Sequence, residues 1–159
     1  ENTLIDKKFT SDLGLANSKA RLRMMTLYQI SASTSGIVVG TGNKIEDFGV
    51  GFYTKYGDGG VDISPIADCT KSQIWDMGKH LNILEEIQMA EPTDGLWSDG
   101  RTDTTQLGLT YKQIEHLMDR PTEEGYEKYL EIRKKNLHKM KAIPVCKFDG
   151  KENLASNTD

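Results

Sequence analysis

Residues 36–62 read GIVVGTGNKIEDFGVGFYTKYGDGGVD, and this stretch decides the fold that the sequence predicts. The run Ile37-Val38-Val39 breaks into Gly40-Thr41-Gly42, which is the pattern of a buried strand that ends in a loop of exposed backbone amides. In open α/β sheets, ligands bind beyond the carboxyl ends of such strands. The stretch therefore predicts an α/β fold with a binding site at a strand end. An ordinary strand followed by a glycine-rich surface loop is the alternative.

The composition is that of one globular domain or a large part of one. The chain has 159 residues, 36% of them hydrophobic and 28% charged, which allows a sizeable core. The net charge of −4 gives no general electrostatic reason to expect a nucleic acid or an anionic membrane as partner. There is no apolar run of bilayer length and no signal pattern. Cys69 and Cys146 form no C-x-x-C motif, so we expect reduced thiols in a cytoplasmic protein.

The N-terminal part predicts a loop followed by a helix. Residues 1–15 are polar and are expected to form a loop or arm, and Asn17 is the expected N-cap of the helix that follows. Arg21 would lie in the first turn, where the helix dipole does not favour a cation, which points weakly to an anionic partner. A solvated helix charge is the alternative. The expected buried face of this helix contains Ala20, Met24, Leu27, Tyr28 and Ser31.

A second helix is predicted from Thr70 to about Asn82. Thr70 and Gln73 have the spacing of a capping box. Lys71 lies in the first turn, where free amides and positive potential attract phosphate, so it is read as facing a phosphate. A plain surface lysine is the alternative. The expected core face of this helix consists of Ile74, Met77 and Leu81.

The C-terminal half predicts an ordered loop and two further helices. Residues 91–108 have loop composition, and Thr110 with Gln113 repeats the capping-box spacing before an amphipathic segment containing Ile114, Leu117 and Met118. Pro121 is expected to start the last helix, and residues 148–159 a flexible tail. The helix dipole explains part of the basic C-terminal cluster, and a phosphate or carboxylate partner would explain its excess of charge. That cluster contains Arg133, Lys134, Lys135, His138, Lys139 and Lys141.

Several common motifs are absent from the sequence. Ile45 stands where the third glycine of a dinucleotide fingerprint should be, and there is no Walker-type phosphate loop. The residues 58–62 lack EF-hand spacing, the histidines and cysteines lack zinc spacing, and no nucleophile elbow occurs. Polar loops with Thr, Glu, Lys and Asp remain, which suits phosphate and magnesium chemistry. A lone carboxylate such as Glu46 can hold Mg²⁺ when substrate phosphates and water complete its coordination.

Several segments resemble the NAD synthetase family, in order and with fitting spacing between about residues 16 and 147. They are NSKARLRMM at 17–25, VGTGNKIE at 39–46, FYTKYGDGGVD at 52–62 with Pro65, EPTDGLW at 91–97, and the pair His138-Lys139. The resemblance implies an N-type ATP pyrophosphatase with a Rossmann-like, adenine-nucleotide alpha-hydrolase fold, in which helices flank a parallel sheet, and usually a homodimer. Residues 1–159 would be the C-terminal, mostly helical part of that single domain.

The resemblance also implies a reaction and a set of site residues. The nicotinate carboxylate of deamido-NAD would attack the α-phosphate of ATP, and ammonia would then displace AMP from the adenylate to give NAD. Clustered cations and Mg²⁺ would stabilise the charge on phosphorus. By similarity, Glu46 is the magnesium ligand and Asp58 holds ammonium. The implied ATP contacts are Thr41, Lys71 and Thr93, and the implied deamido-NAD contacts are Arg21, Lys55, Asp62, His138 and Lys139.

Two departures from the family pattern shape these expectations. The family's S-G-G-x-D-S pyrophosphate loop and its first strands are not in these residues, and the chain begins with Glu1 rather than Met. We therefore expect a fragment, a truncated relative or one piece of a split enzyme whose separate N-terminal segment carries that loop. The isolated chain is expected not to adenylate its substrate. Residues 41–44 are closer to the glutamine-using branch, but the longer match at 54–62 favours ammonia.

Two other functions stay open at this point. The chain could be a non-catalytic remnant that binds deamido-NAD or dimerises, which the missing pyrophosphate loop favours. It could also be another ATP pyrophosphatase, such as one that amidates a guanine nucleotide or thiolates tRNA. The loop from Lys55 to Asp62 argues against that second alternative, and the acidic charge balance argues against a tRNA substrate.

Overall fold

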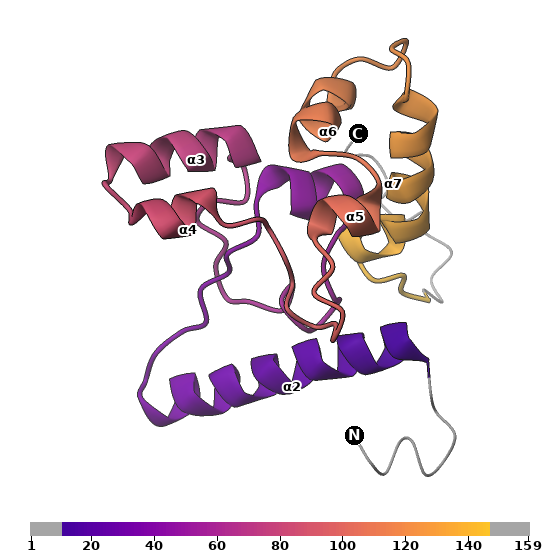
Figure 1. The fold of residues 1–159 in the computed structure, drawn as a ribbon. Helices are drawn as coiled ribbons and strands as arrows, with labels where there is room; N and C mark the ends of the chain where they lie inside the picture. Colours follow the sequence, from indigo (N-terminus) through magenta and orange to yellow (C-terminus); the bar gives the residue numbers. More distant parts are fainter. Residues whose placement is uncertain (1–10, 147–159) are drawn as a thin grey trace.

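A computed structural model describes residues 11–146, and Figure 1 shows their arrangement. A long helix, α2, lies along one side of the molecule, and the shorter helices lie above it in that view. Within the described residues, no helix combines the length and the apolar character that a bilayer crossing would require. The elements are α2 (Asp12–Ser33), the π-helical turn η1 (Ile45–Val50), α3 (Lys71–His80), α4 (Glu85–Met89), α5 (Asp103–Leu107), α6 (Tyr111–Met118) and α7 (Tyr126–Met140).

Residues 11–146 are mostly helical, as expected for the C-terminal part of the domain, and do not by themselves form the parallel sheet expected for the family. Its expected strand at 36–40 makes a single parallel bridge, from Val39 to Ile63. Val38 is buried, but Ile37 is 59% and Val39 53% exposed. A parallel strand is normally paired on both sides and covered on both faces. The described residues offer this strand only one short partner, so the extended segment does not develop into a ladder.

Helix α2 begins earlier than the sequence predicts, and its buried face is narrower. Ser11 caps it, because its Oγ accepts a hydrogen bond from the Gly14 N–H at 3.2 Å. The expected cap, Asn17, instead accepts a hydrogen bond from the Thr54 hydroxyl at 2.7 Å. The expected loop at 1–15 is therefore helical from Asp12, and its residues 1–10 lie outside the described part. Buried residues on α2 are Ala16, Ala20 and Met24, whereas the predicted Leu27 and Tyr28 are exposed.

The hydrophobic core lies where η1, α6 and α7 meet. Ile45, Val50 and Ile114 are fully buried there. Both capping boxes, at Thr70 and Thr110, are confirmed. The amphipathic face predicted for α6 is also confirmed, since Ile114 and Leu117 are buried and Met118 packs against them. The core cluster consists of Ile45, Val50, Leu107, Leu109, Tyr111, Ile114, Leu117 and Tyr129.

Three predictions for the remaining elements are wrong in whole or in part. On α3, Met77 and Leu81 are 39% and 68% exposed, and Trp75 packs against the core instead. The predicted loop at 91–108 is irregular over residues 91–102, as expected, but its last part forms the short helix α5. Helix α7 begins at Tyr126 rather than at Pro121, because Gly125 has a φ of 92°. A left-handed glycine interrupts a helix, so the residues after Pro121 form separate turns.

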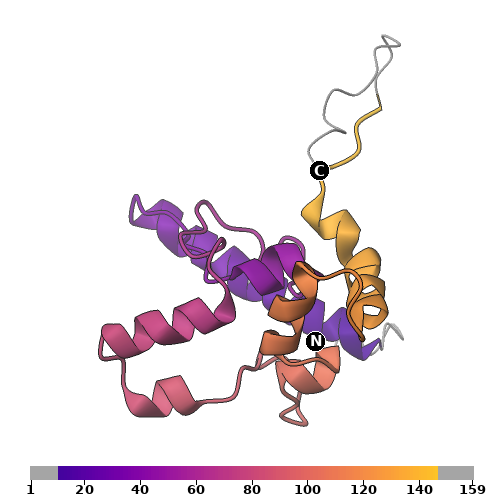
Figure 2. The ribbon, with the colours of Figure 1, turned by 90° about the horizontal axis from the view of Figure 1, so that it is seen from above.

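Helices α3 and α4 lie on the opposite side of the molecule from α7, as Figures 1 and 2 show. The turn η1 lies between them and contacts both α6 and α7. Cys69 and Cys146 are free thiols, as predicted. The tail predicted at 148–159 lies outside the described residues.

Candidate functional site

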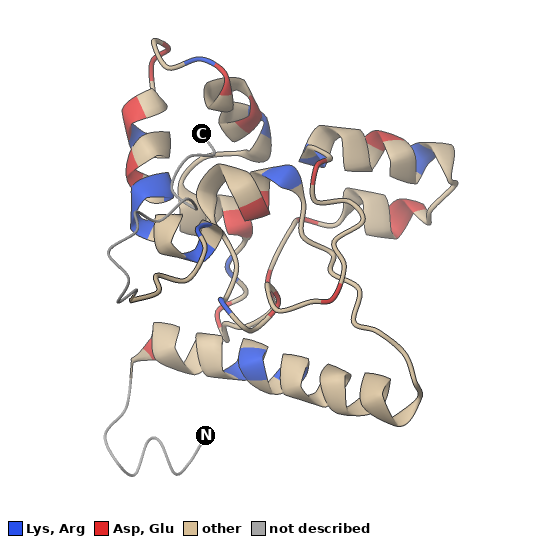
Figure 3. Cartoon of the chain, turned by 180° about the vertical axis from the view of Figure 1, so that it is seen from behind, with Lys and Arg blue, Asp and Glu red and all other residues tan. Residues whose placement is uncertain are grey.

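The predicted site residues gather around η1 and the loop that follows it. Figure 3 shows the acidic residues of η1 between the N-terminal end of α3 and the basic turns of α7. On the α3 side, Glu46 meets Lys71, together with Asp103 and Tyr111, and we call these four residues the Glu46 cluster. On the α7 side, residues 51–60 meet α2 and α7, and we call this segment the Lys55 loop.

The first turn of η1 is held by Asn43, which the sequence patterns did not single out. Its side chain is 1% exposed, and its Oδ1 accepts hydrogen bonds from the N–H groups of Ile45 at 3.0 Å and Glu46 at 3.1 Å. Asn side chains stabilise turns in this way. The backbone of Glu46 is therefore fixed by a buried polar side chain three residues before it.

Beside this turn, the backbone of Gly42 passes close to the side chain of Asp47, whose carboxyl group has a raised pKa. A Cβ at Gly42 would lie 2.4 Å from the Asp47 carboxylate oxygens, so the backbone at Gly42 leaves no room for a side chain. Burial raises the pKa of Asp47 to about 6, and the charges of Glu46 and Asp58 add to the shift. The three carboxylates Glu46, Asp47 and Asp58 thus make this region favourable for a cation.

The Glu46 cluster joins four helical elements through side chains. The Lys71 Nζ of α3 lies 3.2 Å from Glu46 Oε1, and the two side chains are 20% and 16% exposed. The Tyr111 hydroxyl of α6 lies 2.7 Å from the same Glu46 oxygen and also 2.7 Å from Asp103 Oδ2 of α5. The Lys71 ammonium lies 4.7 Å from the centre of the Tyr111 ring, close enough for a cation–π contact.

Asp103 is the most buried acid of this cluster. The residue is 6% exposed, and its Oδ1 has no hydrogen-bond partner in the described structure. Burial raises the pKa of Asp103, and the hydrogen bond with Tyr111 opposes that shift. Burial also raises the pKa of Tyr111, with the Glu46 and Asp103 carboxylates adding to it. The phenol therefore keeps its proton and serves as a hydrogen-bond donor to a carboxylate.

The Glu46 cluster fits a magnesium site that substrate completes, and does not fit a closed metal site. No group of three or more His, Cys, Asp or Glu side chains in residues 11–146 could hold a metal ion. Both hydrogen bonds to the Glu46 carboxylate go to Oε1, so Oε2 is the oxygen available to a cation. Mg²⁺ commonly takes one or two carboxylates and completes its shell with phosphates and water.

The first turn of α3, which contains Lys71, does not offer the free amides from which the sequence argument predicted a phosphate site. The sequence argument relied on free amides in the first turn of α3. Instead, the N–H and hydroxyl groups of Ser72 donate to the Glu115 carboxylate at 2.9 and 2.7 Å, and the Gln73 N–H donates to Thr70. A carboxylate from α6 therefore already occupies that end of the helix, and Lys71 points to Glu46.

The Lys55 loop brings together four of the residues assigned to deamido-NAD. The Arg21 Nε of α2 donates to the Lys55 carbonyl at 3.2 Å, and the Lys55 Nζ donates to the His138 carbonyl at 3.2 Å. Lys139 donates to the carbonyls of Gly51 at 2.9 Å and Tyr53 at 2.7 Å. One cation at the end of α7, Lys139, therefore holds backbone carbonyls of this loop.

The charges of Asp58 and Lys139 influence each other, and partial burial shifts the pKa of each group. Burial raises the pKa of Asp58, while the hydrogen bond from the Thr54 N–H at 2.9 Å lowers it. Burial lowers the pKa of Lys139, and the charge of Asp58 opposes that shift. Arg133, also on α7, donates to the carbonyls of Phe48 and Gly49. The basic end of α7 thus has a structural role that the helix-dipole account did not include.

The other predicted residues lie on connecting segments. Asp62 accepts hydrogen bonds from the Val38 N–H at 2.7 Å and the Tyr28 hydroxyl at 3.3 Å, so it fastens the extended segment. The Thr93 hydroxyl donates to the Arg101 carbonyl at 3.1 Å within its own loop. Thr41 is exposed at the end of the segment 36–40.

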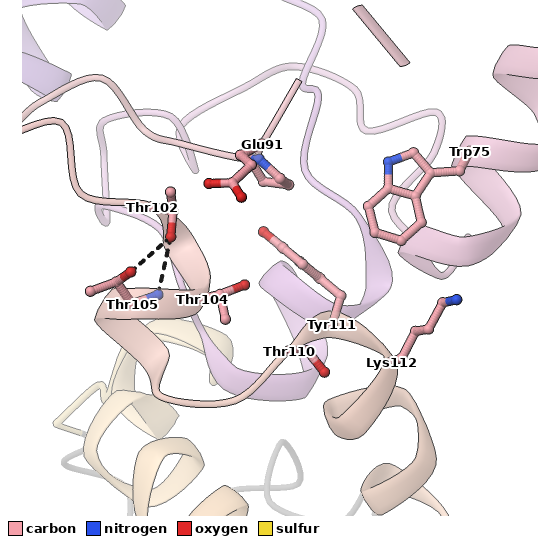
Figure 4. Close-up of a pocket in the computed structure, with 9 residues that line it drawn as sticks. Trp75, Glu91, Thr102, Thr104, Thr105, Thr110, Tyr111 and Lys112 are labelled. Atoms are coloured by element: carbon pink, nitrogen blue, oxygen red, sulfur yellow. Dashed lines mark hydrogen bonds between the residues drawn. The ribbon is translucent and has the colours of Figure 1, made fainter. Parts of the chain in front are cut away.

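A pocket of about 580 Å³ lies beside the Glu46 cluster. Figure 4 shows the Tyr111 ring between Trp75 and the threonines of α5. One side of Tyr111 therefore faces the pocket, while its hydroxyl belongs to the Glu46 cluster. Pockets of this size accommodate small organic ligands. The lining consists of Trp75, Glu91, Pro92, Thr102, Thr104, Thr105, Thr110, Tyr111 and Lys112.

The sequence patterns do not point to Tyr111, Asp103 or Asn43. Tyr111 and Glu46 are 65 residues apart, so no local spacing relates them. The available signals were weak: Tyr111 and Asp103 each directly follow the threonine that caps their helix. Such positions identify helix starts and say nothing about which distant residue they contact.

Several known proteins are similar to this chain in sequence. The NH(3)-dependent NAD(+) synthetase of Carboxydothermus hydrogenoformans is 43% identical over 136 residues, which cover 83% of this chain and 54% of that protein. The enzyme of the same name from Thermoplasma acidophilum is 36% identical over 137 residues, covering 82% and 56%. The chain thus spans about half the length of the curated relatives that it matches.

Two solved structures are also similar. The NMN synthetase from Francisella tularensis has a TM-score of 0.82 and 34% identity, over 92% of this chain and 61% of that one. The NH3-dependent NAD synthetase from Campylobacter jejuni, in complex with the nitrate ion, has a TM-score of 0.66 and 27% identity, over 92% and 60%. The family model described as NAD synthase matches residues 2–153. The chain therefore belongs to the NAD synthase family.

Proposed function

We propose that this chain serves in NAD biosynthesis, as part of a ligase that amidates deamido-NAD to NAD with ammonia and ATP. The observation that carries the proposal is the partly buried Glu46–Lys71 pair, which combines a carboxylate for magnesium with a cation for phosphate at one point. Similarity to proteins named NH(3)-dependent NAD(+) synthetase supports ammonia as the nitrogen source. The reaction would pass through an adenylate and release pyrophosphate and AMP.

The proposed roles follow the two groups of residues. Around the Glu46 cluster, Glu46 would hold Mg²⁺ through Oε2 while Lys71 neutralises ATP phosphate charge, and Thr41 and Thr93 would contact ATP from their loops. Mg²⁺, when bound, would supply further charge stabilisation at phosphorus. Deamido-NAD would lie along the Lys55 loop. Its proposed contacts are Arg21, Lys55, Asp62, His138 and Lys139.

Asp58 is our proposed site for ammonium. It lies on the Lys55 loop, where the charges of Lys139 and Glu46 act on its carboxyl group and its own charge acts on Asp47. A carboxylate there would attract ammonium and orient the nitrogen toward the adenylate. Charged groups fixed in advance around a reacting centre stabilise its transition state without reorganising.

Two further features of the proposal concern assembly. Because the 159 residues do not include an S-G-G-x-D-S segment, we propose that they do not adenylate deamido-NAD by themselves. A pyrophosphate-binding segment would come from the remainder of the enzyme, and two copies would form a homodimer. Exposed apolar side chains on α2 are compatible with such contacts, among them Leu22, Met25 and Ile30.

A second candidate is synthesis of NMN. The NMN synthetase structure has the higher TM-score of the two structures compared, 0.82 against 0.66. Both candidates amidate a nicotinate carboxylate, so they use the same chemistry and differ in the size of the nucleotide. Separate titrations with deamido-NAD and with nicotinate mononucleotide distinguish them, since only a dinucleotide site discriminates strongly against the smaller compound.

Isothermal titration calorimetry of the 159-residue chain tests the proposal. Deamido-NAD and Mg²⁺-ATP are titrated separately into the natural chain and into Lys71→Ala. We expect Lys71→Ala to weaken ATP binding about 10–100-fold, the usual effect of losing a hydrogen bond to a charged group, and to leave deamido-NAD binding unchanged. Lys135→Ala is the matched control, because Lys135 is exposed and pairs only locally with Glu131. Equal losses in both variants, or no binding of either nucleotide, would contradict the proposal.

A further inference from the structure

The Tyr111 hydroxyl occupies a position that core packing does not require. Its oxygen is equidistant from two carboxylates, at 2.7 Å from Glu46 Oε1 and 2.7 Å from Asp103 Oδ2. The ring of Tyr111 belongs to the hydrophobic core and makes an edge contact with Trp75. A phenylalanine would fill the same space, so the hydroxyl has a separate function.

Asp103 is the buried one of the two carboxylates that the Tyr111 hydroxyl contacts. It is the first residue of α5, its N–H donates to the Pro92 carbonyl at 3.0 Å, and its side chain is buried. A carboxyl group removed from water is costly unless hydrogen bonds compensate for the lost solvation. In the described structure, Oδ2 reaches Tyr111 and Oδ1 has no partner. Stability alone would favour an apolar residue here, which suggests that the acid is retained for its effect on Tyr111.

We propose that Asp103 and Tyr111 are positioning residues for Glu46: Asp103 fixes the Tyr111 hydroxyl, and that hydroxyl fixes the Glu46 carboxylate. Two constraints then act on Glu46 Oε1, the hydroxyl at 2.7 Å and the Lys71 ammonium at 3.2 Å. With Oε1 held, the direction of Oε2 is set. The inference concerns the orientation of Glu46, and its consequence for Mg²⁺ rests on the proposed function.

The consequence for a metal is quantitative. Hydrogen-bonding partners that orient a ligating carboxylate typically contribute about 10–100-fold to metal affinity. Tyr111→Phe and Asp103→Ala should therefore each weaken metal binding by about that factor. Asp103→Asn can donate an amide N–H to the Tyr111 oxygen and leave the single phenol proton for Glu46, so it should restore most of the affinity that Asp103→Ala loses.

The first measurement is Mn²⁺ binding in the presence of ATP, followed by electron paramagnetic resonance on the 159-residue chain. Tyr129→Phe is the matched control, since Tyr129 is 4% exposed, lies in the same core cluster and belongs to α7 rather than to the Glu46 cluster. We expect about a 10–100-fold loss for Tyr111→Phe and less than about twofold for Tyr129→Phe. Equal effects of the two variants would overturn the proposal.

The second measurement needs no metal, so it separates this inference from the proposed function. Urea midpoints are measured for Glu46→Gln, Asp103→Ala and the double variant, first in the natural background and then in the Tyr111→Phe background. We expect the coupling between the two changes to be larger in the first set than in the second. Direct repulsion between the carboxylates acts in both sets, so the difference between them reports the hydroxyl.

The two measurements have distinct failures. The same coupling in both backgrounds would overturn the positioning role of Tyr111, whatever the metal does. If coupling depends on Tyr111 but the natural chain binds no Mn²⁺ with ATP, the positioning is supported and Glu46 is not a metal ligand of this chain. That second result would count against the proposed function alone.

Discussion

Removing the Asn43 side chain should destabilise the chain more than removing an ordinary helix cap does. Asn43 is 1% exposed, and its Oδ1 accepts hydrogen bonds from the N–H groups of Ile45 and Glu46 at 3.0 and 3.1 Å. Asn43→Ala deletes both acceptor contacts at once. The Ile45 N–H lies in the fully buried start of η1, where water does not replace the lost partner.

The expected magnitude follows from these two losses. A helix-capping side chain contributes about 1 kcal/mol, and a buried N–H left without a partner costs about 1–3 kcal/mol. Asn43→Ala should therefore lower the free energy of unfolding by about 2–4 kcal/mol, a large share of the usual stability of a domain. Asn43→Asp keeps an acceptor oxygen but adds a buried charge next to Glu46 and Asp47. Its free energy of unfolding should therefore lie between those of the natural chain and Asn43→Ala.

Urea denaturation followed by far-ultraviolet circular dichroism measures the change. Thr110→Ala is the control, because Thr110 caps α6 from an exposed position and accepts a single backbone hydrogen bond, from Gln113 at 3.2 Å. We expect about 1 kcal/mol for this control. A loss for Asn43→Ala no larger than that for Thr110→Ala would refute the reasoning, since burial of the Ile45 N–H would then have no measurable cost.

Two further predictions concern the charges around η1. Lys139→Met keeps the aliphatic part of the side chain but loses the hydrogen bonds to the Gly51 and Tyr53 carbonyls. We expect urea denaturation to show that the free energy of unfolding falls by about 1–3 kcal/mol. A fall of less than about 0.5 kcal/mol, the usual effect of a surface substitution, would show that these bonds do not stabilise the chain. Asp47 has a pKa raised to about 6, so its stabilising contribution is complete below its unfolded-state pKa and is lost as the pH rises through about 6. In metal-free buffer, the urea midpoint of the natural chain should fall between about pH 4 and 6, and Asp47→Asn should flatten that fall; an unchanged pH profile in the variant would contradict the assignment.

The predictions that succeeded depend on residues close together in the chain. Thr70 and Thr110 were recognised as capping boxes because the cap and its glutamine are three residues apart, and the structure confirms both. The amphipathic face of α6 is likewise a matter of spacing along one helix. Where two caps competed, the local pattern failed: Asn17 is a good capping residue, but Ser11 begins α2 and Asn17 binds Thr54.

The sequence by itself also determined the family, because the motifs at 39–46 and 52–62 are specific and lie in order. It determined which charged residues are candidates for ATP, magnesium and deamido-NAD contacts. It did not determine what those residues touch. Lys139, read from the sequence as a substrate contact, holds two backbone carbonyls, and Lys71, read as facing a phosphate, pairs with the Glu46 carboxylate.

Only the tertiary structure decided the environment of Glu46. Tyr111 is 65 residues away along the chain, and packing of α5 and α6 against η1 brings its hydroxyl and Asp103 to that carboxylate. Local spacing reflects the 3.6-residue period of a helix and the reach of a capping side chain. Contacts between elements depend instead on which apolar faces bury one another, and that free energy is shared across the whole core. The arrangement that orients Glu46 is therefore a property of the folded chain.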